Sequence, residues 1–324
     1  MQYQPKPLFK ERIEALLENK QDVENFWQYS EMPLPKTIRC NTLKISPEEL
    51  KKRLEEKGWK IKQPFSSYPE VMIIESDLQP GELGKTKEHL LGYYYVQEIS
   101  SMMPILALQP KAEDILLDLC ASPGSKTTQA SAMMKNKGTI IANDKDIARI
   151  SILSANLEKC GCSNVIVTRH DGVQLCEKLK KLNMKFDKIL ADVPCSGEGN
   201  LRSSPKTLLT WNIKVVERLS RIQRKIAESA ISVLKEGGEL LYSTCTHSPE
   251  ENELNIQYLL DNYNLKIEKI QPPLKTREGI TDWQGQKLNP ELKKACRIWP
   301  QDNSTEGFFL CKMRKMGKND DKFI

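Results

Sequence analysis

The chain of 324 residues has only three histidines, and no two of its nine cysteines form a CxxC pair. Zinc sites usually combine cysteine and histidine ligands at short, fixed spacings, so the sequence predicts no metal site. An odd number of cysteines also argues against a disulfide framework. We therefore expect reduced thiols in a reducing compartment.

The sequence also lacks long hydrophobic runs: no apolar stretch could cross a bilayer, and MQYQPKPLFKERIEALL has no signal-peptide core. We expect a cytoplasmic protein that does not bind membranes. The formal net charge of +6 is a mild basic excess, which permits an anionic partner such as nucleic acid without requiring one. Hydrophobic residues at 39% and charged residues at 28% are typical of a globular protein, and the length favours two domains.

The first hundred residues mix short helical and strand patterns. A polar helical stretch over 7–30 is followed by a strand-like TIRCNTL, a helix capped by Ser46 that ends at Gly58, and the strand-like WKIK and EVMIIES. This pattern predicts a small α+β domain packed before the main one, over residues 1–98.

From Asp114 the pattern changes to apolar strands that alternate with helices. The strands are DILLDLC, GTIIAND, NVIVTR, FDKILADVP and GELLYSTC, and helices are expected near 125–136, 146–160, 174–182, 214–235 and 249–262. Buried strands separated by helices indicate a parallel sheet covered on both faces, an α/β fold. Two more strands, LKIEKIQ and an antiparallel GFFLCKMRK, would give a mostly parallel seven-stranded sheet over residues 99–316, before a tail at 317–324.

Three successive strand ends carry residues suited to a nucleoside. The first leads into DLCASPGSKT, where Gly124 lets the backbone approach a ligand at the start of a helix. The second ends at Asp144, whose spacing from Gly124 suits a carboxylate that binds a ribose diol. The third leads to Asp171, which could contact an adenine edge. Ligands of open α/β sheets bind at this edge, so an adenosine-containing cofactor is expected.

The next two strands end in cysteines. Asp192 and Cys195 follow the fourth strand in ADVPCSGEG, and Cys245 ends the fifth. Ser248 as N-cap and Pro249 in a first turn predict a helix directly after Cys245, whose positive end would stabilise a thiolate. A single cysteine is more often a small buried hydrophobic residue than a nucleophile, but two thiols at neighbouring strand ends beside an aspartate indicate chemistry.

Two thiols, a carboxyl group and a nucleoside cofactor match the needs of cytosine methylation at carbon 5. A thiolate that adds to carbon 6 makes carbon 5 nucleophilic, a carboxyl group near ring nitrogen 3 stabilises the developing charge, and a base then removes the hydrogen from carbon 5. Spacing alone does not decide which of the two cysteines attacks.

The motifs YYVQEISSMMP, DLCASPGSKT, DVPCSGEG, YSTCTHSPEENE and RIWPQDNSTEGFF resemble those of the NOL1/NOP2/Sun family of S-adenosylmethionine-dependent RNA 5-methylcytosine methyltransferases. The resemblance covers most of the chain and implies a Rossmann-like methyltransferase domain after a small RNA-recognition-like domain. The cofactor-binding residues that it implies are Cys120, Ala121, Ser122, Pro123, Gly124, Ser125, Lys126, Asp144, Arg149, Asp171 and Asp192.

The same resemblance assigns the catalytic residues. It implies that Cys245 is the nucleophile and that Asp192 and Cys195 form the second catalytic motif, whereas DNA cytosine methyltransferases attack with the cysteine of their PC motif. Two positions depart from the family pattern: Ser122 and Ser125 stand where the family usually has Ala and Gly. Because both residues are small, we expect tolerance, with the tighter constraint at Ser125.

RNA is the expected partner. Five basic residues after the catalytic loop could contact phosphates or form a solvated helix face: Arg202, Lys206, Arg218, Arg221 and Arg224. The tyrosines at 93–95 could stack on bases or belong to a core. Modest size and the absence of a recognisable extra domain favour tRNA, with rRNA as the alternative, and a monomer is expected.

Two other classes of function remain open from the sequence. An NAD-dependent oxidoreductase could use the same type of sheet, but the chain lacks a GxGxxG loop and both cysteines would be idle. A non-catalytic RNA-binding or assembly factor is the other, and the intact pair Cys195 and Cys245 argues against it.

Overall fold

The computed structural model describes residues 3–317, so most of the expected tail at 317–324 lies outside the described residues. The chain forms two compact units: Pro35–Leu190, and the residues up to Leu34 together with those from Ala191 onward. Each unit is described separately, and the domain bounds expected from the sequence stay a prediction.

The Pro35–Leu190 unit begins with a small antiparallel sheet in the order β2-β3-β1-β4. Its strands are β1 (Lys36–Cys40), β2 (Ile61–Lys62), β3 (Val71–Ile74) and β4 (Tyr94–Val96). Helix α3 (Pro47–Glu55) starts at Ser46, whose side chain caps it as predicted, and the short helices α4 (Glu82–Lys85) and α5 (Lys87–Leu90) follow β3. Leu50 and Leu54 of α3 pack in one core with Ile38 and the fully buried Tyr94.

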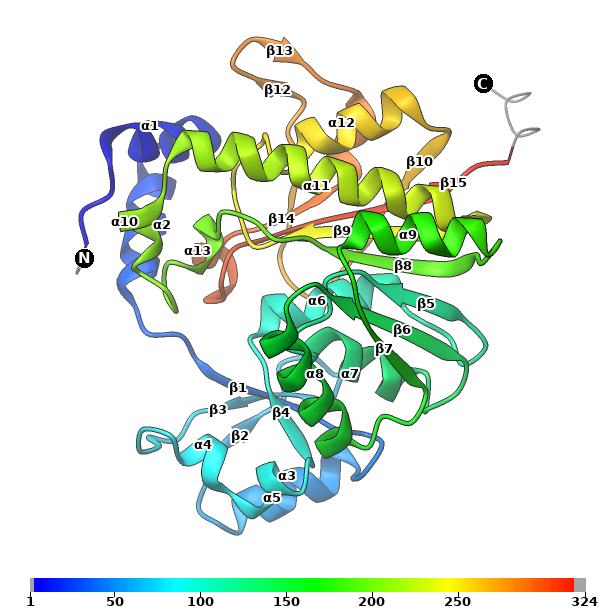
Figure 1. Cartoon of the computed structure of the whole chain (residues 1–324). Helices are drawn as coiled ribbons and strands as arrows, with labels where there is room; N and C mark the ends of the chain where they lie inside the picture. Colours follow the sequence, from blue (N-terminus) through cyan, green and yellow to red (C-terminus); the bar gives the residue numbers. More distant parts are fainter. Residues whose placement is uncertain (1–2, 318–324) are drawn as a thin grey trace. The chain divides into compact units, whose positions relative to one another are not determined.

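The rest of this unit contains the parallel strands expected from the sequence. They are β5 (Ile115–Asp118), β6 (Thr139–Asp144), β7 (Val165–Arg169) and β8 (Phe186–Asp192), in the order β8-β5-β6-β7. The accompanying helices are α6 (Ile99–Leu108), α7 (Ser125–Met133), α8 (Ile147–Cys160) and α9 (Gly172–Lys181) (Figure 1). The expected α/β fold is therefore confirmed, but the sheet is mixed and has nine strands within the described residues, where seven mostly parallel strands were expected.

The other unit carries mostly antiparallel strands. In the order β11-β14-β15-β9, they are β11 (Arg277–Glu278), β14 (Cys296–Ile298), β15 (Phe308–Lys315) and β9 (Leu234–Thr244), and β10 (Leu265–Glu268) pairs with β15. The antiparallel pairing of β15 with β9 is as predicted. Strands β11 and β14 have only two and three residues, too few for a periodic pattern, and the sequence prediction missed them.

Helices in this unit come from both ends of the chain. They are α1 (Pro7–Leu16), α2 (Lys20–Glu31), α10 (Thr207–Thr210), α11 (Ile213–Val233), α12 (Glu253–Asn262) and α13 (Pro300–Asn303), with 3₁₀ turns η1 (Glu198–Asn200) and η2 (Pro290–Lys294) and a hairpin of β12 (Asp282–Trp283) and β13 (Gln286–Lys287). Phe9 and Phe26 from the N-terminal helices share a core with Trp211 and Trp299, which lie about two hundred residues or more later in the sequence.

One predicted boundary is wrong. The helix expected directly after Cys245 begins only at Glu253, and Ser248 is not its N-cap. The hydroxyl of Ser248 instead donates to Glu198 at 2.6 Å, while Asn252 Nδ2 donates to the Thr246 carbonyl at 2.9 Å. These bonds hold residues 246–252 as a turn, so the thiol of Cys245 does not lie at the N-terminus of a helix.

No helix within residues 3–317 is both long enough and apolar enough to span a membrane.

Candidate active site

The structure brings Cys195 and Cys245 together, although fifty residues separate them. Cys195 lies in the loop after β8 and Cys245 directly follows β9, and their Sγ atoms are 3.0 Å apart as free thiols. Both side chains are partly buried. The two sulfurs are hydrogen-bonded to one another, and each is able to donate or to accept.

The contacts around the two sulfurs indicate which one donates. Cys195 Sγ accepts the backbone N–H of Cys245 at 3.3 Å. Cys245 Sγ accepts the side-chain amide of Asn200 at 3.2 Å. Burial and the neighbouring Cys245 raise the pKa of Cys195 well above its usual value, the contact with Cys245 being the largest cause. Cys195 is therefore the protonated thiol that donates, and Cys245 is the sulfur that accepts.

Backbone contacts that only glycine permits fix the main chain of Cys245. The N–H of Gly199 donates to the Cys245 carbonyl at 2.9 Å, and the N–H of Gly307 donates to the Gly199 carbonyl at 2.9 Å. A Cβ atom on Gly199 would lie 2.3 Å from the Gly307 carbonyl oxygen, a distance that real Cβ atoms do not show. Glycines in two separate motifs, GEG and TEGFF, thus allow the close backbone packing that holds the main chain of Cys245.

Glu251 is a buried carboxyl group that sequence analysis did not single out as a site residue. Its Oε2 accepts the backbone N–H of Ser196 at 3.0 Å and the Gln223 amide at 2.6 Å, while Oε1 is buried without a hydrogen-bond partner. Burial, followed by the neighbouring Glu198, raises the pKa of Glu251 to about 7. The only sequence signal was its place in SPEEN, where it reads as a helix-start residue.

Asp192, the third predicted catalytic residue, lies at the end of β8 and is partly buried. Its Oδ1 accepts the hydroxyl of Ser243 at 2.8 Å, and Ser243 is two residues before Cys245 on β9. Val193 donates its N–H to the Ser243 carbonyl at 3.1 Å. The carboxyl group is therefore fixed to the strand that carries the second thiol.

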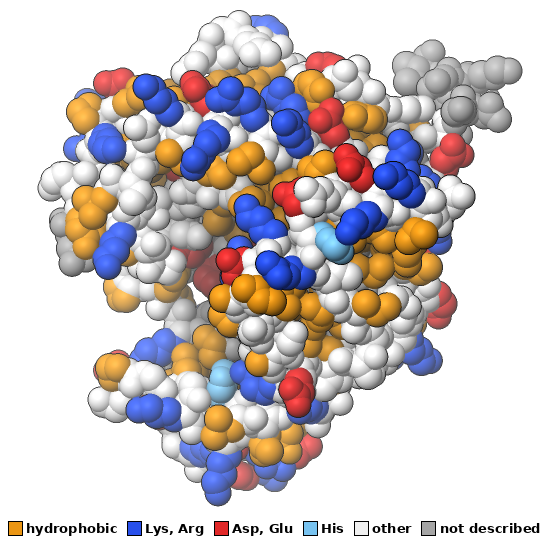
Figure 2. Space-filling view, in the orientation of Figure 1, with side chains coloured by type: hydrophobic (Ala, Val, Ile, Leu, Met, Phe, Trp, Pro, Cys, Tyr) orange, Lys and Arg blue, Asp and Glu red, His pale blue; other side chains and the backbone are white. Residues whose placement is uncertain are grey.

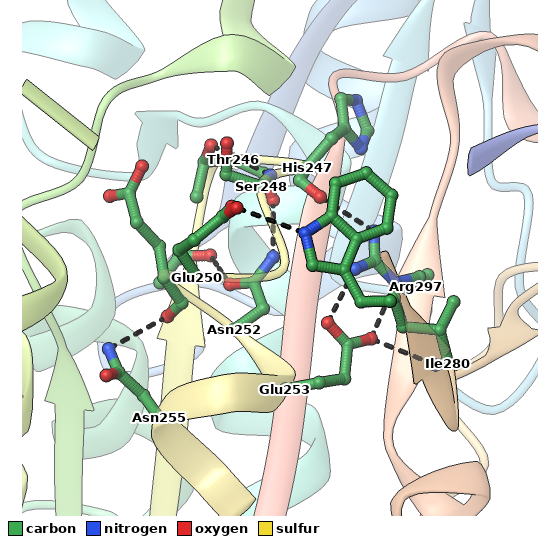
Figure 3. A network of polar contacts seen from close by, with 12 residues as sticks. Thr246, His247, Ser248, Glu250, Asn252, Glu253, Asn255, Ile280 and Arg297 are labelled. Atoms are coloured by element: carbon green, nitrogen blue, oxygen red, sulfur yellow. Dashed lines mark hydrogen bonds and ion pairs between the residues drawn. The ribbon is translucent and has the colours of Figure 1, made fainter. Parts of the chain in front are cut away.

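A dense polar network surrounds the turn after Cys245 (Figure 3). Arg297 and Glu253 point toward one another and form a bidentate ion pair, with Nε–Oε1 at 2.7 Å and Nη2–Oε2 at 2.5 Å, and both side chains are almost fully buried. Arg297 also donates to the His247 carbonyl at 2.9 Å. Burial, followed by the charge of Arg297, lowers the pKa of His247 to about 3, so this ring is neutral. The ring stacks on Trp299, with centroids 4.1 Å apart.

The predicted cofactor loop, residues 120–126, lies in the other unit between β5 and α7. Gly124 has a φ of +102°, which side chains disfavour, and it is the N-cap of α7. Lys126 is buried and its Nζ donates to Ser101 at 2.9 Å. Ser122, which departs from the family pattern, donates its hydroxyl to the Arg149 carbonyl at 2.8 Å, and Arg149 Nη2 donates back to the Ser122 carbonyl at 2.6 Å.

The predicted acids lie at the carboxyl ends of β6 and β7. Asp144 is 3% exposed, its Oδ1 accepts the N–H of Asp146 at 3.1 Å, and its Oδ2 is 3.4 Å from Arg149 Nη2. Asp171 is exposed and caps α9 through Oδ1, which accepts the N–H of Val173 at 3.0 Å. Both carboxylates stand where ribose and adenine groups bind in open α/β sheets, so the residues fit an adenosine-containing cofactor.

Arg39, in TIRCNTL of β1, is a residue of this region that sequence analysis did not single out. It is 2% exposed and donates through Nη1 to the Ser125 carbonyl at 2.7 Å, through Nη2 to Thr128 Oγ1 at 2.8 Å, and to Gln97. Burial lowers its pKa to about 10, so it stays charged at neutral pH. An arginine inside an apolar strand was the available signal, because such a charge needs buried partners.

The basic residues expected to contact phosphates differ in their surroundings. Arg202 donates to the carbonyls of Met32 at 3.0 Å, Pro33 at 2.7 Å and Thr305 at 3.1 Å, so it joins three segments of its own unit. Arg218 and Arg221 are exposed on α11, where Figure 2 shows Lys and Arg side chains gathered. Of the tyrosines, Tyr94 is fully buried and belongs to the core.

Two protein-family models match the chain. Residues 105–314 match the family described as 16S rRNA methyltransferase RsmB/F, and residues 6–99 match the N-terminal domain of 16S rRNA methyltransferase RsmF. Together they take in almost the whole described chain.

Individual relatives carry two kinds of name. A "tRNA (cytosine(49)-C(5))-methyltransferase" of Pyrococcus abyssi is 42% identical over 294 residues, which are 91% of this chain and 92% of that protein. The "Ribosomal RNA small subunit methyltransferase F" of Vibrio parahaemolyticus is 38% identical over 309 residues, 95% of this chain and 62% of that protein. The chain thus spans less than two thirds of the second relative.

Solved structures agree with these matches. A methyltransferase homolog protein from Pyrococcus horikoshii has a TM-score of 0.80 at 34% identity, over 96% of this chain and all of that one. NSun6 from the same organism, determined with SFG, has a TM-score of 0.81 at 26% identity, over 97% and 99% of the two chains. From the two family models and the 42% identical relative, we conclude that this chain belongs to the RsmB/F family of RNA methyltransferases.

Proposed function

We propose that this S-adenosylmethionine-dependent RNA cytosine-5 methyltransferase acts on tRNA and attacks the base with Cys245. The reaction class follows from the family and its named members. The observation that carries the finer proposal is the thiol pair, in which Cys195 donates and the sulfur of Cys245 accepts two hydrogen bonds. A sulfur that accepts hydrogen bonds is prepared to hold the charge of a thiolate.

Each residue of this site has a defined task in the proposed mechanism. The thiolate of Cys245 forms a bond to carbon 6 of cytosine, and the electron pair of the ring moves toward nitrogen 3. The carboxyl group of Asp192, in its protonated form, donates a hydrogen bond that stabilises this charge. Carbon 5 can then attack the methyl group, which bound S-adenosylmethionine supplies. A base takes the proton from carbon 5, and the electron pair left behind restores the double bond between carbons 5 and 6. The thiolate of Cys245 then leaves carbon 6, and Cys195 assists this release.

The cofactor residues support the same proposal. We assign the backbone of residues 120–126 and the side chain of Lys126 to the methionine and ribose part of the cofactor. Asp144 takes the ribose hydroxyls, with Arg149 beside it, and Asp171 lies near the adenine. Asp192 contributes to cofactor binding as well as to catalysis. That NSun6 was determined with SFG agrees with a cofactor site in this fold.

The tRNA substrate is favoured by the archaeal relative, because its length is matched almost completely. The rRNA alternative is favoured by both family descriptions, although the named rRNA relatives are longer than this chain. Bisulfite sequencing of tRNA and rRNA, from cells with and without the gene, tests both. Loss of 5-methylcytosine from a tRNA position supports the proposal, and loss from rRNA alone would replace it with the alternative.

We further propose that the protein is a cytoplasmic monomer that binds RNA through exposed basic residues of α11. Arg218 and Arg221 motivate this assignment. Lysine and arginine contacts release counterions from RNA, so the affinity for tRNA should fall steeply as salt rises. A flat salt titration, or an unchanged salt slope in the double variant Arg218→Gln/Arg221→Gln, would remove α11 from the interface.

A further inference from the structure

Asn200 is a polar side chain that neither the family motifs nor the mechanism above uses. It is the last residue of η1, and its backbone is fixed on both sides: its N–H donates to the Gly197 carbonyl at 3.0 Å, and its carbonyl accepts the N–H of Ser204 at 2.7 Å. From this fixed backbone, the side-chain Nδ2 lies 3.2 Å from Cys245 Sγ.

We propose that Asn200 is a catalytic residue that stabilises the thiolate of Cys245 through its amide N–H. The proposal deepens the function given above and rests on Cys245 being the nucleophile. Two adjacent residues then hold Cys245, because Gly199 binds its carbonyl while Asn200 binds its sulfur.

The direction of the hydrogen bonds supports this role. Cys195 Sγ already accepts the backbone N–H of Cys245, so its own S–H is available to donate to the sulfur 3.0 Å away. Cys245 Sγ then faces two donors, the thiol of Cys195 and the amide of Asn200. Two donors and no acceptor are the surroundings of an anionic sulfur, and hydrogen bonds donated to a charged form favour that form.

The same arrangement separates the tasks of the two thiols. Cys195 keeps its proton, because deprotonation would place two negative sulfurs in contact. Of the two sulfurs, the Asn200 amide contacts that of Cys245, so it favours the charged form of Cys245 and not that of Cys195. A carboxylate at position 200 would have nearly the same shape but would only accept hydrogen bonds, and it would oppose the thiolate.

The test measures the reactivity of each thiol separately. Trypsin releases Cys245 and Cys195 in different peptides, residues 236–266 and 189–202, and neither contains another cysteine. Purified full-length protein is treated with iodoacetamide between pH 6 and pH 10, and the alkylation rate of each peptide is followed by mass spectrometry. The variants are Asn200→Leu, which removes the donor and keeps the same branching at Cγ, and Asn200→Asp. Asn262→Asp, at the exposed end of α12, makes the same change of charge elsewhere.

We expect the midpoint of Cys245 alkylation to rise by about one pH unit in Asn200→Leu, roughly a tenfold loss of rate at neutral pH. Asn200→Asp should raise it further, and Asn262→Asp should leave it unchanged. In wild type, Cys245 should react at lower pH than Cys195. An unchanged midpoint in Asn200→Leu would overturn the proposal, and a lower one would mean that the amide oxygen faces the sulfur, which also overturns it.

Single-turnover methylation of tRNA across the same pH range separates the role of Asn200 from the proposed function. If Asn200→Leu shifts alkylation but wild type methylates no RNA, the proposed function fails while the role of Asn200 at the sulfur stands. If wild type methylates tRNA but neither profile shifts, the role of Asn200 fails alone. A parallel shift of both profiles supports both.

Discussion

The turn after Cys245 and the loop from Cys120 to Lys126 are both reactive segments after a strand, but they are held in different ways. Around Cys245, the charged and polar side chains of Glu251, Glu253 and Arg297 are buried and bonded to one another or to backbone. Around the cofactor loop, the buried Lys126 and Asp144 stand beside the exposed Arg149 and Asp171, and Ser122 and Arg149 exchange bonds through their backbone carbonyls.

This difference corresponds to two kinds of task. A nucleophile must stand in one orientation before the substrate arrives, so its surroundings are fixed by groups that cannot exchange with water. A cofactor loop needs backbone that a ligand can approach and side chains that remain available to it. We therefore expect substitutions near Cys245 to alter both chemistry and stability, and substitutions in the cofactor loop to alter mainly binding.

The largest effect is expected at the thiols themselves. Cys245→Ala cannot form the bond to carbon 6, so methylation should vanish. Cys195→Ala should still attack, and release should stall, which leaves enzyme and RNA covalently joined. A denaturing gel after incubation with tRNA and cofactor should show a slow band for Cys195→Ala and none for Cys245→Ala. The reverse pattern would make Cys195 the nucleophile.

The buried ion pair is the next point at which the two regions should differ. Arg297→Leu leaves Glu253 buried and uncompensated, which should cost about 3–5 kcal/mol of unfolding free energy. Arg149→Leu removes an ion pair whose arginine side chain is 51% exposed, so the cost should stay within about 1 kcal/mol. Urea denaturation compares the two variants, and equal losses would contradict the contrast.

Glu251 should make stability depend on pH. Burial raises its pKa to about 7 in the folded chain, so the folded state binds a proton that the unfolded state releases near the ordinary value of 4.5. Its contribution is fully present below about pH 4.5 and is lost as pH rises through about 7, a change of roughly 3 kcal/mol. Glu251→Gln keeps a neutral group of the same shape, so the unfolding free energy of wild type should fall relative to this variant between pH 5 and pH 8. Parallel curves would contradict the assignment.

The last effect is confined to binding and is expected at Asp144. Asp144→Ala removes the acceptor for charge-assisted hydrogen bonds from the ribose, which should weaken S-adenosylmethionine by about 1.5–3 kcal/mol. Calorimetry measures the affinity directly, with Asp146→Ala, the exposed N-cap of α8, as the matched control. Unchanged affinity in Asp144→Ala would remove this carboxylate from the cofactor site.

Much of the fold followed from local sequence patterns. Apolar runs such as ILLD in β5 and TIIAND in β6 alternate with stretches of helical periodicity. Hydrophobic periodicity and turn residues are properties of neighbouring residues, so they can be recognised in the sequence. The same holds for Ser46, whose position before Pro47 predicted a helix cap that the structure contains. The positions of Asp144, Asp171, Cys195 and Cys245 at strand ends followed once the strands were recognised.

The sequence by itself thus determined the α/β class, the family and the residues that stand at the strand ends. Only the tertiary structure decided that Ser248 donates a hydrogen bond to Glu198 and does not cap a helix. It also decided that Arg39 donates to the Ser125 carbonyl at the start of α7, and that Arg202 donates to backbone carbonyls of its own unit. It also placed Asn200 on the sulfur of Cys245. The physical reason is that a hydrogen bond between residues far apart in the chain forms only where the whole fold brings them together. The residues next to each partner in the sequence do not determine which distant residue it will contact.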